Sequence, residues 1–161
     1  MAGKTWKDWA ALAVLLAMCF GVAFAGSQAT TTGVGTWYAK LAKPTWNPPG
    51  WVFGPVWTVL YAMMALAAWL VWLRRDRRPV SAAMALFVVQ LALNGAWSWV
   101  FFHFHRVDLA LVNIALLLVM IAATLGAFRK VRPAAAVLLI PYLLWVLFAT
   151  CLNGAIWSLN R

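Results

Sequence analysis

Charged residues are missing from five long stretches of this sequence, and that pattern limits the fold more than any other feature. The stretches cover residues 9–39, 44–73, 79–105, 109–128 and 133–160, and all 16 charged residues lie in the 25 remaining positions. A helix that crosses a bilayer needs about 20 consecutive, mostly apolar residues. We therefore predict an all-α protein, an integral membrane bundle of five transmembrane helices that occupies residues 1–161 as a single domain.

Prolines and charge clusters set the expected ends of these helices, at about 9–27, 51–73, 79–102, 108–128 and 133–159. Proline costs a hydrogen bond inside a helix but suits its first turn. Pro79 and Pro133 are therefore expected at helix starts, whereas Pro141 lies inside the last helix and should kink it. The only long loop is expected at residues 28–50, after the first helix.

The basic residues lie between the apolar stretches, where they act as signals of membrane topology. Nucleic-acid binding needs a contiguous basic face on a folded module, so no nucleic-acid partner is expected despite the net charge of +10. Cytoplasmic loops carry excess Lys and Arg. Five crossings divide the basic residues nine to four and predict a cytoplasmic N-terminus, with Lys4, Lys7, Arg74, Arg75, Arg77, Arg78, Arg129, Lys130 and Arg132 on one side and Lys40, Lys43, Arg106 and Arg161 on the other.

The first apolar stretch also resembles a signal peptide. Lys4 and Lys7 precede an apolar run at 9–24, and the small-residue triplet 23–25 resembles a cleavage site. We expect this stretch to be retained as a transmembrane helix, because its removal would leave four spans.

Ionisable residues are absent from the middle of every predicted span, which excludes the groups that proton relays, ion-coupled carriers and voltage sensors use. His103 and His105 form a pair with no third ligand nearby, so we expect an interfacial loop there and neither a metal nor a cofactor. No internal repeat supports the inverted-repeat design of many transporters. No ordinary set of catalytic acid, base and nucleophile appears either.

Twelve tryptophans are the main chemical feature of the spans. Tryptophan prefers the headgroup level of a bilayer, and an interfacial belt explains those near predicted helix ends, namely Trp6, Trp9, Trp51, Trp69, Trp72, Trp99 and Trp157. Deeper tryptophans share helical faces with small and polar residues. Such faces suit a flat, mostly apolar ligand, and they comprise Trp57, Tyr61, Met64 and Ala68 on the second helix and Trp145, Ala149 and Asn153 on the fifth.

The third helix carries a stripe of polar and aromatic residues at helical spacing, which consists of Gln90, Asn94, Trp97, Ser98 and Phe101. Two explanations fit an uncharged stripe of this kind. The first is hydrogen bonding between helices, worth about 0.6–2 kcal/mol per contact in membranes. The second is the lining of a cavity, with Asn94 orienting a ligand. Composition alone does not decide between them.

One long motif spans the predicted loop and the start of the second helix: Trp37-Tyr38-x-x-Leu41-x-Lys43-Pro44-x-Trp46-x-Pro48-Pro49-x-Trp51-Val52-Phe53-Gly54-Pro55-Val56-Trp57-Thr58-x-Leu60-Tyr61. Two later segments accompany it, Gln90-Leu91-x-Leu93-Asn94-x-x-Trp97-Ser98 and Pro141-Tyr142-Leu143-x-Trp145 through Phe148-Ala149-Thr150-x-Leu152-Asn153. Together they resemble the TspO/MBR family, the tryptophan-rich sensory proteins related to the mitochondrial translocator protein. The resemblance covers nearly the whole chain from about Gly21.

This resemblance implies a five-helix bundle that forms a homodimer and whose long first loop caps a pocket. In the family the pocket takes porphyrins and synthetic ligands of the benzodiazepine-receptor type. The matching positions imply that ligand-binding residues are Tyr38, Pro48, Trp57, Tyr61, Asn94, Trp97, Ser98, Trp145 and Ala149. Ala92 and Ala96, spaced four apart, would permit close helix approach in a dimer.

Three functions fit these observations. The expected one is a membrane receptor or sensor, surrounded by lipid, that binds protoporphyrin or a haem-type tetrapyrrole and regulates tetrapyrrole or stress responses. The second is a porphyrin carrier, which could only be passive without charged groups or repeats. The third is an enzyme that degrades porphyrin in light and oxygen with Trp57 or Trp145 as redox-active side chains.

Overall fold

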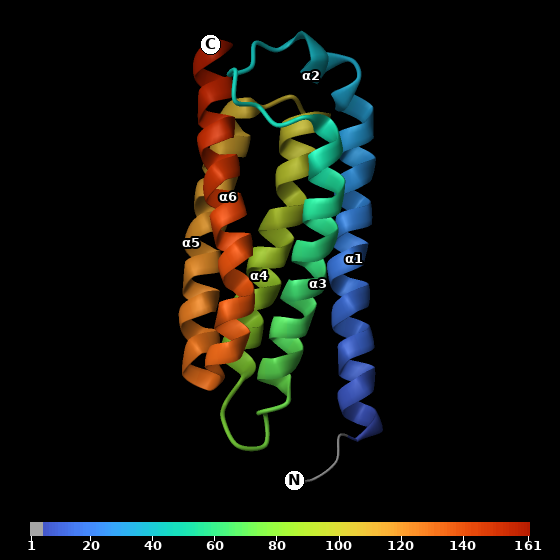
Figure 1. The fold of residues 1–161 in the computed structure, drawn as a ribbon, viewed down its shortest axis with the longest axis vertical. Helices are drawn as coiled ribbons and strands as arrows, with labels where there is room; N and C mark the ends of the chain where they lie inside the picture. Colours follow the sequence, from blue (N-terminus) through green and yellow to red (C-terminus); the bar gives the residue numbers. More distant parts are fainter. Residues whose placement is uncertain (1–4) are drawn as a thin grey trace.

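The computed structural model describes residues 5–161 and contains five helices long and apolar enough to cross a membrane. These are α1 (Trp6–Val34), α3 (Phe53–Trp72), α4 (Ser81–Ser98), α5 (Val107–Val131) and α6 (Pro133–Leu159). They stand side by side in one bundle (Figure 1). Three short elements connect them: α2 (Trp37–Lys40), the 3₁₀ turn η1 (Gly50–Val52) and the π-helical turn η2 (Trp99–His103). The prediction of an all-α bundle with five spans is confirmed.

The first helix is longer than expected, because it continues to Val34 instead of ending near residue 27. The extension has the composition of a loop but is helical, and its threonine hydroxyls are satisfied by donating to carbonyls three or four residues earlier. Thr30 donates to Gly26, Thr31 to Gln28 and Thr32 to Ala29. The predicted loop at 28–50 is therefore shorter than expected and contains α2.

The proline predictions are confirmed in part. Pro133 is the first residue of α6, as expected for a proline whose missing N–H is not needed there. Pro79 lies two residues before α4, which begins at Ser81, so its placement in the first helical turn was wrong. Pro141 lies inside α6, and the kink expected there stays a prediction.

The helices pack in a ring of neighbours in which α1 contacts α3 and α4, α3 contacts α6, and α5 contacts both α4 and α6. Large side chains fill the centre, and Met64, Phe87 and Phe128 are fully buried. Ala65, Ala67 and Ala68 are also fully buried on α3, where small side chains let neighbouring helices approach closely.

The start of α1 is fastened to the end of α3 by polar contacts. Arg75 forms an ion pair with the Asp8 carboxylate at 2.8 Å, and the Trp69 indole N–H donates to the Asp8 backbone carbonyl at 2.7 Å. Trp69 is only 7% exposed. Its assignment to an exposed interfacial belt was therefore wrong, because this tryptophan joins two helices inside the bundle.

The helix order brings the N-terminal end of α1, the α3–α4 turn and the α5–α6 junction to one end of the bundle (Figure 1). The loop after α1, the α4–α5 connection and the C-terminus lie at the other end. Eight of the nine residues assigned to the more basic side are at the first end, and Lys4 lies outside the described residues. The orientation of these ends in a membrane stays a prediction.

Candidate functional site

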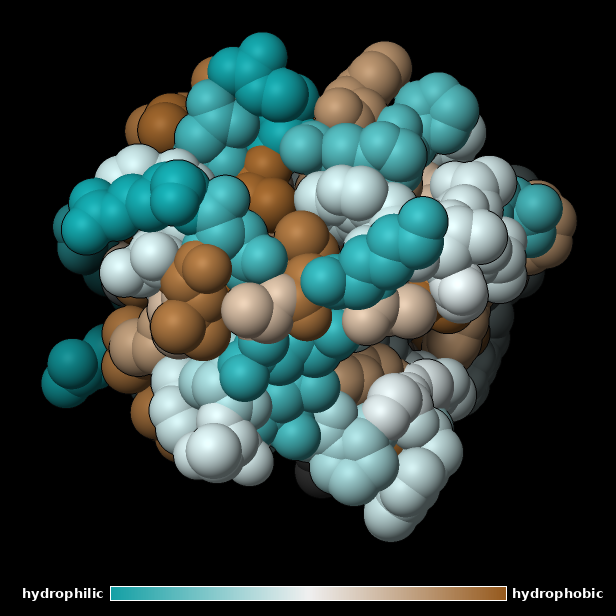
Figure 2. Space-filling model, turned by 90° about the horizontal axis from the view of Figure 1, so that it is seen from above, coloured by the Kyte–Doolittle hydropathy of each residue, from teal (hydrophilic) through white to brown (hydrophobic). Residues whose placement is uncertain are grey.

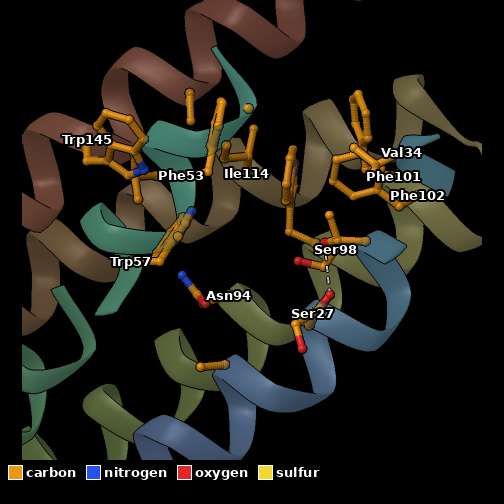
Figure 3. A pocket seen from close by; sticks show the side chains of 18 of the residues that line it. Ser27, Val34, Phe53, Trp57, Asn94, Ser98, Phe101, Phe102, Ile114 and Trp145 are labelled. Carbon is orange, nitrogen blue, oxygen red and sulfur yellow. Dashed lines mark hydrogen bonds between the residues drawn. The ribbon is translucent and has the colours of Figure 1, made fainter. Parts of the chain in front are cut away.

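A cavity of about 610 Å³ lies in the half of the bundle that the loop covers. Its walls come from all five long helices, from η2 and from the loop (Figure 3). None of its lining residues carries a charge. The structure brings all nine predicted site residues together around this one space: Tyr38, Pro48, Trp57, Tyr61, Asn94, Trp97, Ser98, Trp145 and Ala149.

Aromatic rings form two sides of the cavity. On the side of α3 and α6, Trp57 lies 5.5 Å from Tyr61, and Trp145 meets Phe53 edge-on at 5.8 Å, all between ring centroids. On the side of α4 and η2, Trp97 stacks on Phe101 at 5.0 Å. Figure 3 shows Phe101 and Phe102 across the cavity from Trp57 and Trp145. These contacts fix ring orientations. The space between the two sides is therefore bounded by preset, rigid surfaces.

A hydrogen-bonded chain closes the bottom of the cavity and joins three helices. The Tyr61 hydroxyl donates to Asn94 Oδ1, Asn94 Nδ2 donates to the Tyr142 hydroxyl at 3.0 Å, and that hydroxyl donates to Gln90 Oε1 at 2.8 Å. Gln90 lies outside the cavity lining, whereas Asn94 lines it. Gln90 therefore fits only the explanation of hydrogen bonding between helices. Asn94 fits both explanations, because it lines the cavity while its amide is already bonded to Tyr61 and Tyr142.

A second set of hydrogen bonds joins α4 to α6 and α6 to α5. The Trp97 indole donates to Asn153 Oδ1 at 3.1 Å, and Asn153 Nδ2 donates to the Val107 carbonyl at 3.1 Å. The Trp145 indole nitrogen, in contrast, is buried and has no hydrogen-bond partner among the described residues. The ring of Trp145 lines the cavity, whereas its indole N–H is enclosed by neighbouring side chains.

The loop covers the end of the cavity and is attached at several points. Asn160 clasps it with two bonds, accepting from the Ala42 N–H and donating to the Ala42 carbonyl, each at 2.9 Å. Trp37 stacks on His105 with 4.5 Å between centroids. The Tyr38 hydroxyl donates to Asn47 Oδ1 at 3.1 Å. Burial raises the pKa of Tyr38 above its ordinary value, and the hydrogen bond with Asn47 offsets part of the increase.

The sequence prediction missed the contribution of α1. Side chains from this helix line the cavity at a spacing of three and four residues, which places them on one face: Phe20, Phe24, Ser27, Thr31 and Val34. This spacing of three and four residues was the sequence signal that could have identified the cavity-facing side of the first helix. It was hidden because the first helix was expected to end near residue 27, so Thr31 and Val34 were assigned to a loop.

Comparison with known proteins identifies this arrangement. Residues 13–158 match the sequence model of the TspO/MBR family. The chain belongs to the TspO/MBR family. It is 42% identical to the tryptophan-rich protein TspO of Chlorobaculum tepidum over 96% of this chain and 98% of that protein. It is 40% identical to the tryptophan-rich sensory protein of Cereibacter sphaeroides, with 95% and 93% covered, and 44% identical to the human translocator protein, with 78% and 75% covered.

Membership of the TspO/MBR family and the five apolar helices together show an integral, multi-pass membrane protein. Family membership also supports a sensor or receptor of the TspO type. The matched residues include every element of the cavity wall. The cavity is therefore the candidate functional site of this TspO/MBR protein.

Proposed function

We propose that this TspO-type receptor binds a porphyrin, such as protoporphyrin or a haem-type tetrapyrrole, in the aromatic cavity, and that flat synthetic ligands of the benzodiazepine-receptor type use the same space. The observation that carries the proposal is an uncharged cavity of about 610 Å³ between two aromatic sides. Sites for small molecules usually measure about 300–1,000 Å³ and are mostly apolar with a few polar groups.

Two features favour a large, planar and mostly apolar ligand. Ring stacking contributes about 0.5–1.5 kcal/mol per aromatic pair beyond the burial of area, so a flat conjugated molecule gains most from these walls. The lining contains no charged residue, so it suits a ligand whose buried surface is mostly apolar. The presence of the ligand is then signalled by a change in the positions of the helices that line the cavity.

A titration of reconstituted protein with protoporphyrin in darkness tests the proposal, with quenching of tryptophan fluorescence as the readout. Saturable binding is expected. Trp57→Phe and Trp145→Phe should each weaken binding by roughly two- to tenfold, because a smaller ring remains to stack. Trp99→Phe is the matched control, since Trp99 is partly exposed and does not line the cavity. Absence of saturable binding, or equal losses in all three variants, would contradict the proposal.

Two further arms of the same experiment separate binding from its alternatives. Illumination in air tests degradation, in which Trp57 or Trp145 would act as a redox-active side chain, by loss of the porphyrin spectrum. Sealed vesicles test passive transport by the appearance of porphyrin inside. If the protein is a receptor only, the loss of the porphyrin spectrum and the appearance of porphyrin inside the vesicles should both equal those of protein-free vesicles.

We also propose that the protein is a homodimer in contact through α4. Ala92 and Ala96 are exposed one helical turn apart on this helix, and small residues let helices of two copies approach closely. Crosslinking in native membranes should trap a dimer, and Ala96→Leu should reduce its yield. A monomer alone at every crosslinker concentration would contradict this.

The N-terminus is proposed to be retained and cytoplasmic, because the end of the bundle that carries it holds most of the basic residues. A periplasmic reporter should be active at the C-terminus and inactive at the N-terminus, and activity only at the N-terminus would contradict this orientation. An intact mass that lacks residues 1–25 would contradict retention.

A further inference from the structure

The cavity has an uncovered side between the upper halves of α1 and α3. Several residues that line the cavity are also exposed at the bundle surface there, which means that the space reaches the outside between these helices. We name this gap the lateral slot and define it by its edges, Phe24, Ser27 and Thr31 on α1 and Gly54 and Thr58 on α3. Ser27 and Trp57 lie on opposite sides of the cavity (Figure 3).

Glycines let the upper half of α1 approach α4 and η2 closely. A Cβ atom on Gly33 would lie 2.5 Å from the Phe102 carbonyl oxygen, and one on Gly26 would lie 3.2 Å from Ser98 Oγ. The upper half of α1 is therefore pressed against α4 and η2. A Cβ atom on Gly54, at the α3 edge, would meet nothing within 4 Å. On one side, α1 is thus in close contact with α4 and η2. On the other side, the space beside Gly54 of α3 is open.

The edges of the lateral slot are suited to contact with hydrocarbon. Each hydroxyl there donates to a carbonyl of its own helix: Ser27 to Phe24 at 2.7 Å, Thr31 to Gln28 at 2.9 Å and Thr58 to Gly54 at 2.9 Å. Polar groups must be satisfied inside a membrane because no water is available to them. With these donors occupied, the edges present mainly carbon atoms to a passing ligand.

The end of the cavity that faces water is covered instead. The loop crosses it and is attached through the Asn160 clasp, the stacked pair Trp37 and His105, and a contact of Trp46 with Phe148 at 5.8 Å between centroids. In the view from above, hydrophilic and hydrophobic side chains together cover this end (Figure 2).

We infer that the ligand passes between the cavity and the bilayer through the lateral slot, edge first, so that the protein exchanges a membrane-dissolved molecule with the surrounding lipid. This rests on the proposed function for the identity of the ligand. It goes beyond that function because it assigns the access route and the phase from which the ligand comes. A flat, apolar molecule partitions into lipid, which supplies it directly at the slot.

Rates of protoporphyrin binding in vesicles test the route. Thr58→Trp should narrow the slot and lower both the association and the dissociation rate constants by roughly tenfold. Val59→Trp is the matched control on the exposed neighbour that does not line the cavity. Asn160→Ala releases the loop clasp and should leave association within about twofold of wild type. Faster association in Asn160→Ala, with wild-type rates in Thr58→Trp, would overturn the inference.

A second experiment needs no porphyrin and separates failure of the route from failure of the proposed function. The cavity thiol of a Ser98→Cys, Cys151→Ser protein is treated with a lipid-dissolved maleimide or with a sulfonated maleimide in water. Cys19 is fully buried, and the Cys151→Ser protein alone measures its background. Labelling should be fast from lipid, slowed by Thr58→Trp, and slow from water. Equally fast labelling from water, or labelling from lipid that Thr58→Trp does not slow, would overturn the inference.

Discussion

Replacement of Gly33 by alanine should destabilise the bundle, because the added methyl group has no room. Its Cβ would lie 2.5 Å from the carbonyl oxygen of Phe102 and 3.2 Å from the carbonyl carbon. These are backbone atoms of η2, so no flexible side chain can rotate away, and α1 or η2 must shift. Overpacking of this kind costs about 1–3 kcal/mol. The shift would also widen the close contact that holds α1 against η2.

Gly21→Ala is the matched comparison in the same helix, since a Cβ atom there meets nothing within 4 Å. Both substitutions gain the same helix propensity, about 0.5–1 kcal/mol for alanine over glycine, so that term cancels in their difference. Gly33→Ala should therefore have a free energy of unfolding about 1–3 kcal/mol below that of Gly21→Ala. Circular dichroism during unfolding by sodium dodecyl sulfate in mixed micelles measures it. Equal stability of the two variants would refute the close contact between α1 and η2.

Three further predictions concern the polar contacts. Asn94→Ala removes two interhelical hydrogen bonds and should lower the free energy of unfolding by about 1–3 kcal/mol, as measured in the same unfolding assay, and unchanged stability would contradict it. Trp69→Phe removes the bond to the Asp8 carbonyl and should lower the unfolding midpoint, whereas Trp6→Phe, at an exposed position, should not. The absorbance titration of wild type minus Tyr38→Phe should show a midpoint above the ordinary tyrosine value near 10. Because the folded pKa is raised, the stability contributed by the neutral ring is complete below that ordinary value and is lost as the pH rises, and a midpoint at or below 10 would contradict its burial.

The spans could be predicted from the sequence because their signal is local. Hydrocarbon excludes charges, so the 16 charged residues mark the ends of the helices whatever the tertiary packing. The end of α1 could not be predicted in this way. Its Gly-Ser-Gln-Ala-Thr-Thr-Thr run has a loop composition, yet the packed helix includes it, with the hydroxyls of Thr30, Thr31 and Thr32 satisfied by carbonyls of the same helix.

The residues that line the cavity were predictable for a different reason. Helical spacing placed Trp57, Asn94 and Trp145 on faces that combine aromatic and polar groups, and the family resemblance selected the same positions. Spacing does not say which neighbour a polar group meets, however. The role of Asn94 depended on Tyr61 and Tyr142 from two other helices, and such contacts exist only after the helices are packed.

The two halves of α1 pack against different neighbours, and this explains the unusual composition of the helix. Its lower half must bind α3, which it does through Asp8 and the buried Leu15 and Cys19, while its upper half must leave α3 without leaving the bundle. Glycines at 26 and 33 permit the second contact, with α4 and η2, and the hydroxyls between and beside them donate to carbonyls of their own helix. A uniformly apolar α1 with larger side chains would keep the span but fill the cavity. The loop-like composition is therefore what allows one membrane helix to form both a structural contact and a wall of the cavity.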